Sequence, residues 1–251
     1  MLEPKYEKLS SVKEGVIRLL TIRDREIPEI EILARAEGEL VDTLVLDGER
    51  LPLLDWRYEP RTNSMRGYGK VAEQNCCVNV SSFFGSDTPL DVLIYRELDL
   101  AEYLLHSKIV KVTAFMRGAA CNLIAKCESG AQANLELGVT LAPGTIPQFQ
   151  HRLITTHGMA NDKGVNDLVE QCGVYVFTNE DTRPIVYNDG EYYLYGLTVE
   201  ESVRCTFIQG IVLGRIDKAA LVEQHKHLGE VLAAVHKSAE CGQSVMVGGA
   251  L

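Results

Sequence analysis

The chain has 251 residues, of which 46% are hydrophobic and 24% are charged. This balance is typical of a folded globular protein and excludes a disordered chain. The formal net charge is -10 and the pI is near 5.1. Duplex nucleic acid and anionic lipid surfaces bind basic faces, so neither is expected as the main partner. We predict no nucleic-acid and no membrane partner.

The sequence also predicts the compartment. No apolar run approaches the roughly 20 residues that span a bilayer, and the N-terminal stretch MLEPKYEKLSSVKEG has no apolar core of a signal peptide. The seven cysteines are an odd number and are scattered along the chain. These features are typical of reduced thiols, and we expect a soluble cytoplasmic protein.

Strand patterns dominate the middle of the chain. Residues 15–23 and 40–46 are rich in aliphatic side chains and partly alternate, which predicts two strands. Residues 55–70 are polar and rich in arginine, with Pro60 among them, and indicate a long loop. Further strands are predicted at 109–116, 121–127, 133–141, 149–156 and 173–178. Mostly short turns join these strands, and Arg117-Gly118 forms a hairpin, so we expect an antiparallel or mixed sheet.

Helices are predicted mainly near the C-terminus. Thr198 and Glu201 form the pattern of a capping box that begins a helix extending to about Leu213. Asp217 can cap a second helix, which ends where Gly242 provides a C-cap. An earlier helix is expected around 98–105. The predicted fold class is α+β: one domain over 1–251, with a large open, mainly antiparallel sheet and helices packed on one face.

No cofactor site is predicted within this chain. Residues 67–72 (GYGKVA) match the dinucleotide pattern G-x-G-x-x-A. That pattern functions where a buried strand leads into a helix whose N-terminus binds the pyrophosphate. The preceding residues 59–66 (EPRTNSMR) do not have the composition of a buried strand. We therefore interpret these glycines as loop residues.

Patterns for metal binding and for nucleophilic catalysis are equally weak. Cys76 and Cys77 are adjacent, and other cysteines lack the spacing of a zinc knuckle. His225 and His227 lie two apart on a predicted helix, which places them on different faces. Cys205 lies in an apolar helix and is interpreted as a core residue. We predict no metal site.

One pair of residues can carry chemistry. Asp91 and Tyr95 are four residues apart within TPLDVLIYRELDLAEYLL (88–105), so they share one face of a helix. A carboxylate beside a phenol can orient it while a proton moves to or from a substrate hydroxyl. The alternative is a buried helix start with a capping aspartate and a packed tyrosine. Spacing alone favours that alternative.

A resemblance to a known family favours the catalytic interpretation of Asp91 and Tyr95 over the structural one. Residues 194–201 (LYGLTVEE), 207–211 (FIQGI) and 231–245 (VLAAVHKSAECGQSV) resemble the closing helices of the glucose–fructose oxidoreductase and inositol dehydrogenase superfamily. Those proteins commonly end with a helix reading A-x-x-x-S-A-x-x-G-x-x-V. Residues 3–9 (EPKYEKL) and 15–18 (GVIR) look like the crossover into the family's second domain. No counterpart of the nucleotide-binding domain is found, and residues 28–80 match poorly.

The resemblance implies a site and a ligand class. Residues 88–95 are similar to the segment bearing the family's D-x-x-x-H or D-x-x-x-Y motif, which makes Asp91 and Tyr95 the catalytic pair. Asp99 lies near a second acidic position of that segment. Arg23, Trp56 and Arg57 are weaker candidates for substrate contacts. The implied ligand is a small sugar or polyol, and the implied assembly is a homo-oligomer formed through the exposed sheet face.

Three hypotheses about function remain open. The first is the substrate-binding and oligomerisation domain of a sugar or polyol dehydrogenase, which alone does not act as a dehydrogenase because ordinary side chains store no hydride. A partner protein with a nucleotide-binding domain would then supply NAD or NADP. The second is a non-catalytic module that senses a sugar or binds a protein. The third is a cofactor-free isomerase or lyase that acts on keto-sugars.

Overall fold

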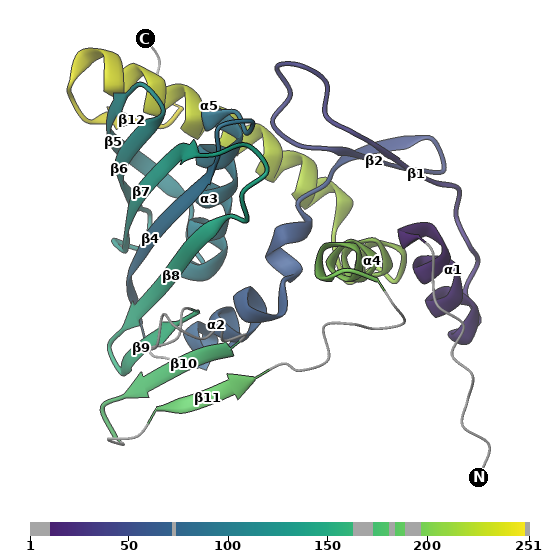
Figure 1. The fold of residues 1–251 in the computed structure, drawn as a ribbon. Coiled ribbons are helices and arrows are strands. Elements are labelled where there is room, and N and C mark those ends of the chain that lie inside the picture. Colours follow the sequence, from purple (N-terminus) through teal and green to yellow (C-terminus); the bar gives the residue numbers. More distant parts are fainter. Residues whose placement is uncertain (1–10, 72–73, 163–172, 181–183, 189–196, 249–251) are drawn as a thin grey trace. The chain divides into compact units, whose positions relative to one another are not determined.

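The computed structural model describes residues 11–71, 74–162, 173–180, 184–188 and 197–248, and it divides the chain into two compact units. The first unit combines residues 1–59 with 189–225, and the second combines residues 60–188 with 226–251. The prediction of a single domain stays a prediction. Figure 1 gives the positions of the elements along the chain.

A nine-stranded sheet forms the second unit, with the order β11-β10-β9-β8-β4-β7-β6-β5-β12. Its strands are β4 (Asn75–Gly85), β5 (Ile109–Arg117), β6 (Ala120–Cys127), β7 (Gln132–Leu141), β8 (Gln148–Thr155), β9 (Gly158–Asn161), β10 (Gly173–Thr178), β11 (Ile185–Asn188) and β12 (Val245–Met246). Among the described strands β4 and β7 pair in parallel, and the other neighbours pair antiparallel. The predicted strands 109–116, 121–127, 133–141, 149–156 and 173–178 are confirmed within a residue or two.

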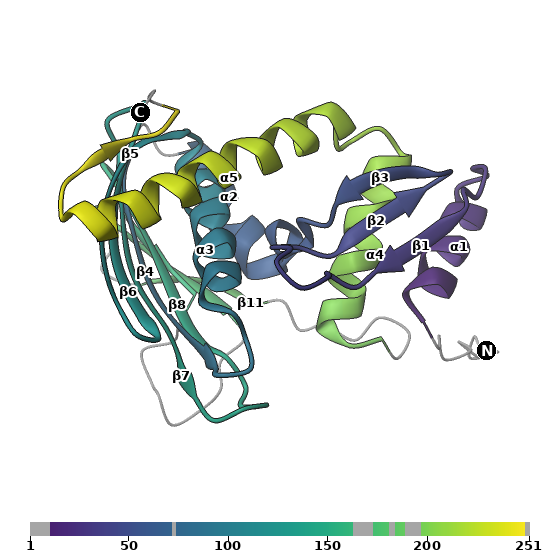
Figure 2. The same cartoon turned by 90° about the horizontal axis from the view of Figure 1, so that it is seen from above.

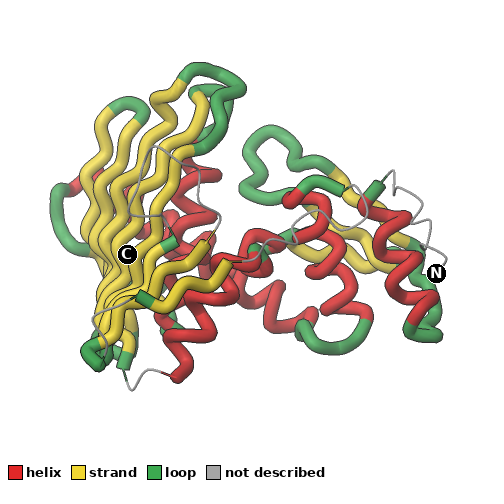
Figure 3. The backbone as a smooth tube through the Cα atoms, turned by 60° about the horizontal axis from the view of Figure 1, so that its bottom comes forward, coloured by secondary structure: helices red, strands yellow, loops and turns green. Residues whose placement is uncertain are grey.

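One face of this sheet is covered by helices. They are α2 (Pro60–Val71), α3 (Leu90–Leu105) and the second part of α5 (Lys218–Cys241). Helix α3 packs on β4, β6 and β7, and α2 packs on β8, β9 and β10. Side chains alternate along each strand, so β6 buries Cys121, Leu123, Ala125 and Cys127 on the helical side. Figure 3 shows the strands side by side with the helices on one side, which confirms the predicted fold class.

The first unit contains a separate small sheet and two helices. Strands β1 (Ile30–Leu33), β2 (Thr43–Leu46) and β3 (Glu49–Pro52) pair antiparallel in chain order, as Figure 2 shows. Helix α4 (Val199–Val212) contacts α1 (Val12–Ile22) and the short 3-10 helix η1 (Asp55–Tyr58). The predicted capping box is confirmed: the hydroxyl of Thr198 accepts from the backbone N–H of Glu201, whose carboxylate accepts from the N–H of Thr198.

One strand predicted in this unit is wrong. Residues 15–23 form most of helix α1 rather than a strand. Ser11 caps this helix by accepting from the N–H of Glu14, and Val16 and Leu20, one turn apart, are its buried side chains. Apolar positions four residues apart fit a helix, and the short run of aliphatic side chains concealed this spacing.

The polar stretch 55–70 is not a loop. It forms η1 and most of α2, which has Pro60 at its first position, where a missing N–H costs nothing. Gly67 and Gly69 lie inside this helix. A Cβ on Gly69 would stand 3.0 Å from Cδ2 of Leu153, so glycine allows the helix to approach β8 closely.

An arginine surrounded by carboxylates lies in the first unit. Arg204 of α4 binds Asp55 through Nε at 3.1 Å and Asp42 through Nη2 at 3.2 Å, and Nη2 is 2.8 Å from Glu200. Burial raises the pKa of Asp55 to about 6, because loss of hydration outweighs the opposing effect of the Arg204 guanidinium. Asp55 therefore binds a proton more readily in the folded than in the unfolded chain.

This raised pKa predicts a pH effect on stability. A carboxyl whose folded pKa lies above its unfolded value contributes stability that is complete below pH 3.8 and lost as the pH rises through about 6. Relative to Asp55→Asn, the wild-type chain should gain up to roughly 3 kcal/mol between pH 7 and pH 4. Urea unfolding of both proteins across this range measures the difference. A constant difference would contradict the assignment.

Candidate functional site

Asp91 lies in the first turn of α3, where a negative charge is favoured by the helix dipole. Its Oδ1 lies 3.0 Å from Nε2 of His236 on α5. The side chains are 44% and 41% exposed, so the pair is open to solvent. The predicted helix around 98–105 extends back to Leu90, which places Asp91 and Tyr95 on the same helix. The sequence did not indicate His236 as a partner of Asp91.

The other predicted residues of α3 lie in the interior. Tyr95 and Asp99 are both 0% exposed. Leu93 is also buried. This burial keeps the phenol of Tyr95 away from solvent. A catalytic role for Asp91 and Tyr95 as a pair stays a prediction, as does a substrate contact by Asp99.

The three weaker candidates belong to the first unit. Arg23 is the exposed C-cap residue of α1, and Trp56 and Arg57 lie half-buried on η1. Asp91, Tyr95 and Asp99 belong to the second unit. The substrate contacts predicted for Arg23, Trp56 and Arg57 therefore stay predictions.

A buried network of charged residues connects α3 to the sheet. His151 of β8 is 2.9 Å from Oε2 of Glu97 through Nε2 and 2.6 Å from Oδ2 of Asp162 through Nδ1. The backbone N–H of His151 also donates to Asp162 at 2.7 Å, and Ser82 of β4 donates its hydroxyl to Glu97 at 3.1 Å. All four residues are buried. The network is therefore a structural connection, closed to substrates.

Electrostatics holds this network in its charged form. Burial alone would lower the pKa of His151, but Asp162 and Glu97 outweigh it and raise that pKa to about 10. Burial alone would raise the pKa of Glu97, and the charge and hydrogen bond of His151 bring it below the usual 4.5. An imidazolium between two carboxylates is the consistent assignment at neutral pH, with both ring N–H groups donating.

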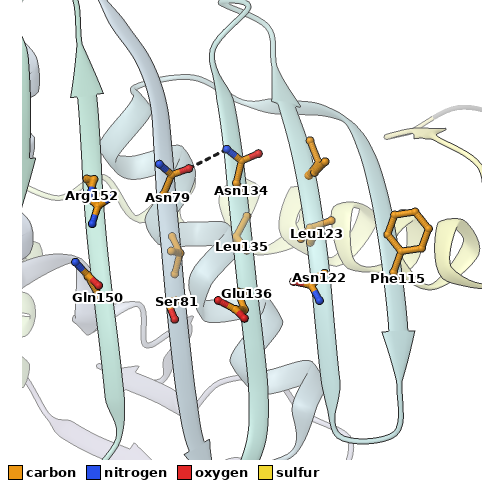
Figure 4. Close-up of a pocket in the computed structure, with 12 residues that line it drawn as sticks. Asn79, Ser81, Phe115, Asn122, Leu123, Asn134, Leu135, Glu136, Gln150 and Arg152 are labelled. Carbon is orange, nitrogen blue, oxygen red and sulfur yellow. Dashed lines mark hydrogen bonds between the residues drawn. The ribbon is translucent and has the colours of Figure 1, made fainter.

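The sheet face opposite α3 carries a shallow groove of about 450 Å³, shown in Figure 4. Because successive side chains alternate between faces, Asn79 and Ser81 point to this face while Val80 is buried. Phe115 and Ile124 are 61% and 47% exposed at one side of the groove. The groove is lined by Asn79, Val80, Ser81, Phe115, Asn122, Leu123, Ile124, Asn134, Leu135, Glu136, Gln150 and Arg152.

Amide side chains order the floor of this groove. Gln132 donates to Oδ1 of Asn134 at 2.6 Å, and Asn134 donates to Oδ1 of Asn79 at 2.8 Å. Glu136 on β7 and Arg152 on β8 add opposite charges. Within the described part of the chain, Nε of Arg152 is buried and has no hydrogen-bond partner. The face is thus mixed in character, with apolar side chains beside polar groups able to bind a partner.

Gly67 and Gly69 do not form a dinucleotide-binding turn. Gly67 and Gly69 lie in the last two turns of α2, which η1 precedes, so the arrangement of strand, glycine turn and helix is missing from residues 55–71. In the part of the chain that the structure describes, no group of three or more histidine, cysteine, aspartate or glutamate residues could hold a metal ion. A search of the described helices finds none with the length and apolar character needed to cross a bilayer.

Comparison with solved structures gives extensive matches. An oxidoreductase from Agrobacterium radiobacter in complex with NAD+, L-tartaric acid and magnesium superimposes with a TM-score of 0.62 and 12% identity over 95% of this chain and 70% of that chain. An oxidoreductase from Thermotoga maritima superimposes with a TM-score of 0.58 and 14% identity, over 78% of this chain and 63% of that chain. Levoglucosan dehydrogenase, in complex with NADH and levoglucosan, superimposes with a TM-score of 0.61 and 13% identity, over 78% of this chain and 65% of that chain.

These matches define the fold. The chain has an α+β fold that is also found in solved oxidoreductases, levoglucosan dehydrogenase among them, which confirms at the level of fold the resemblance predicted from the sequence. It spans 63% of the length of the Thermotoga maritima structure. No protein-family model and no curated protein sequence matches the chain.

Proposed function

We propose that this chain is the substrate-binding and self-associating part of a sugar or polyol dehydrogenase-type oxidoreductase. The observation that carries the proposal is the fold, which is shared over 95% of the chain with an oxidoreductase complexed with NAD+ and L-tartaric acid. Levoglucosan dehydrogenase, a further structural neighbour, holds NADH and levoglucosan. Gly67 and Gly69 lie inside α2 and form no glycine turn for a pyrophosphate. In this proposal, NAD or NADP is held by another polypeptide segment or a partner chain.

Asp91 is the predicted catalytic residue best suited to contact a ligand. Its side chain is 44% exposed, whereas Tyr95 and Asp99 are fully buried. A carboxylate accepts hydrogen bonds from ligand hydroxyl groups, which a sugar or polyol offers in number. In this proposal Asp91 binds a substrate hydroxyl and Tyr95 packs beneath it.

Ligand-observed NMR tests the proposed ligand class. Saturation-transfer spectra of the full chain with myo-inositol, glucose, levoglucosan and L-tartrate at millimolar concentrations should show binding of at least one compound, with tert-butanol as the apolar control. Asp91→Asn should weaken the binding, because the neutral amide is a poorer acceptor. Signals that are absent for all four compounds would contradict the proposed function.

The open sheet face is the proposed surface for self-association. Phe115 is the kind of exposed aromatic side chain that contributes most at interfaces. Glu136 and Arg152 lie on the same face, so in a two-fold dimer the carboxylate of one copy can meet the guanidinium of the other. A second copy of this chain is therefore the occupant that the charges favour.

Two variants test this dimer. Phe115→Asp should weaken self-association by about 30-fold, as expected for the loss of an aromatic residue central to an interface. Val222→Asp changes a helix position that is 49% exposed and should leave association unchanged. Sedimentation velocity over a range of concentrations measures both. The proposed interface would be contradicted by a wild-type chain that stays monomeric. Equal dissociation constants for self-association of wild type and Phe115→Asp would contradict it as well.

A non-catalytic sugar-sensing module is the second candidate. The complete burial of Tyr95 favours it, because a phenol that no ligand reaches cannot exchange a proton with one. This candidate predicts sugar binding with no chemical change in the ligand. Deuterium incorporation into a bound keto-sugar in D2O, with no nicotinamide present, would contradict it and favour a cofactor-free isomerase.

A further inference from the structure

The Asp91–His236 pair differs from the other imidazole–carboxylate contacts of the second unit in its exposure. The side chains of Glu97 and Asp162, which bind His151, are 0% and 4% exposed. His227 binds Glu102 at 2.6 Å, and that carboxylate is also 4% exposed. Among these described imidazole–carboxylate pairs, the Asp91–His236 pair is the one in which both side chains are more than 40% exposed. A ligand in solution can therefore reach this pair.

His236 also lines a surface cavity. The cavity has a volume of about 630 Å³, within the range of small-molecule sites. Helix α5 contributes the charged side chains Glu230, Lys237 and Glu240 to its lining, beside Ala233 and Met246. Carboxylates accept hydrogen bonds and an ammonium donates them, which matches the alternating donor and acceptor character of a polyhydroxylated ligand.

The contact with Asp91 determines which ring nitrogen of His236 can take a proton. An ionised carboxylate only accepts hydrogen bonds, so Nε2 of His236 must carry the hydrogen at the 3.0 Å contact. In the neutral ring the lone pair then lies on Nδ1. The same carboxylate stabilises the imidazolium that forms when Nδ1 takes a proton. This arrangement is that of a general base oriented by a carboxylate.

We propose that His236 is the residue that accepts a hydrogen bond, and then the proton, from a hydroxyl group of a sugar or polyol bound in this cavity. Asp91, a ligand contact in the proposed function, also orients the imidazole ring through Oδ1. The O–H bond of the ligand breaks, the Nδ1–H bond forms, and the electron pair stays on the ligand oxygen. The inference deepens the proposed function and rests on it for the ligand class. It replaces the buried Tyr95 by an exposed residue from a different helix.

The experiment combines affinity with a residue-specific signal. Calorimetry of the full chain with myo-inositol gives the Kd of wild type, His236→Gln, Asp91→Asn and His157→Gln. His157 is the matched control, since it lies half-buried in the same unit at the β8–β9 turn. The Cε1–H resonance of His236, assigned from the His236→Gln spectrum, is followed during the same titration at several pH values.

The expected result is a loss of about tenfold in affinity for His236→Gln, as for the loss of one hydrogen bond to the ligand, with His157→Gln unchanged. Bound myo-inositol should shift the His236 resonance in the wild-type chain. Binding that His236→Gln retains in full, with the resonance unmoved, would overturn the inference and leave the proposed function standing. A wild-type chain that binds none of the four compounds in the NMR experiment would overturn both.

Discussion

Replacement of His151 by leucine is expected to lower the free energy of unfolding by roughly 3–5 kcal/mol, the usual cost of breaking a buried ion pair by removing one partner. The imidazolium is 4% exposed and lies between Glu97 and Asp162 at 2.9 and 2.6 Å. Without it, two carboxylates remain in the interior with their main counter-charge removed. Urea denaturation followed by circular dichroism measures the effect.

Matched variants show whether the loss of stability in His151→Leu comes from the lost charge or from the changed side-chain volume. His157→Leu, at a half-buried histidine outside the network, should change stability by about 0.5 kcal/mol or less. Adding Glu97→Gln to His151→Leu should restore part of the loss, because the amide removes one buried charge that has lost its histidine partner and can still accept from Ser82. If the double variant is less stable than His151→Leu alone, unpaired charge is not the cause.

The same network should produce a defined pH window. The pKa of His151 is raised to about 10, so its contribution is complete below pH 6.5 and is lost as the pH rises through about 10. The pKa of Glu97 lies below 4.5, so its contribution is present above that pH and is lost as the pH falls. The advantage of wild type over His151→Leu should therefore be greatest between these limits.

Phe207→Ala is expected to destabilise the first unit by roughly 3–5 kcal/mol, the range for truncating a fully buried aromatic side chain. Phe207 on α4 is 0% exposed, and its ring meets Tyr58 of η1 edge-on at 5.5 Å between centroids. Phe207→Leu should cost less, because it retains most of the buried volume. Hydrogen exchange of α4 amides locates the effect; equal protection in Phe207→Ala and wild type would contradict it.

Local signals predicted much of the fold. The capping box of Thr198 and Glu201 and the glycine after α5 act within a few residues, so their patterns are visible in the sequence. The strands from 109 to 141 show clear alternation and short turns, which explains their accurate boundaries. In contrast, β4 was missed, because Asn79 and Ser81 on its open face dilute the apolar pattern.

The contacts around the candidate site could not be predicted from the sequence, because they join residues far apart in the chain. Glu97 and His151 are 54 residues apart, and no spacing rule connects them. His236 lies on the helix predicted between Asp217 and Gly242, but the cap residues do not reveal which carboxylate its exposed side chain meets. Spacing singled out Asp91 and Tyr95, and the resemblance favoured them as a site, whereas only tertiary structure distinguishes the exposed carboxylate of Asp91 from the buried Tyr95.

In the proposed function, this chain supplies a ligand-binding surface and the dinucleotide is held by another segment or chain. Isothermal titration of NAD+ and of NADP+ into the purified 251-residue chain tests it most directly. Pyrophosphate recognition needs N–H groups at a glycine turn before a helix, and the described residues present none at 67–71. We predict no binding heat for either dinucleotide at millimolar concentration. A saturable isotherm with a micromolar Kd for either one would contradict the account.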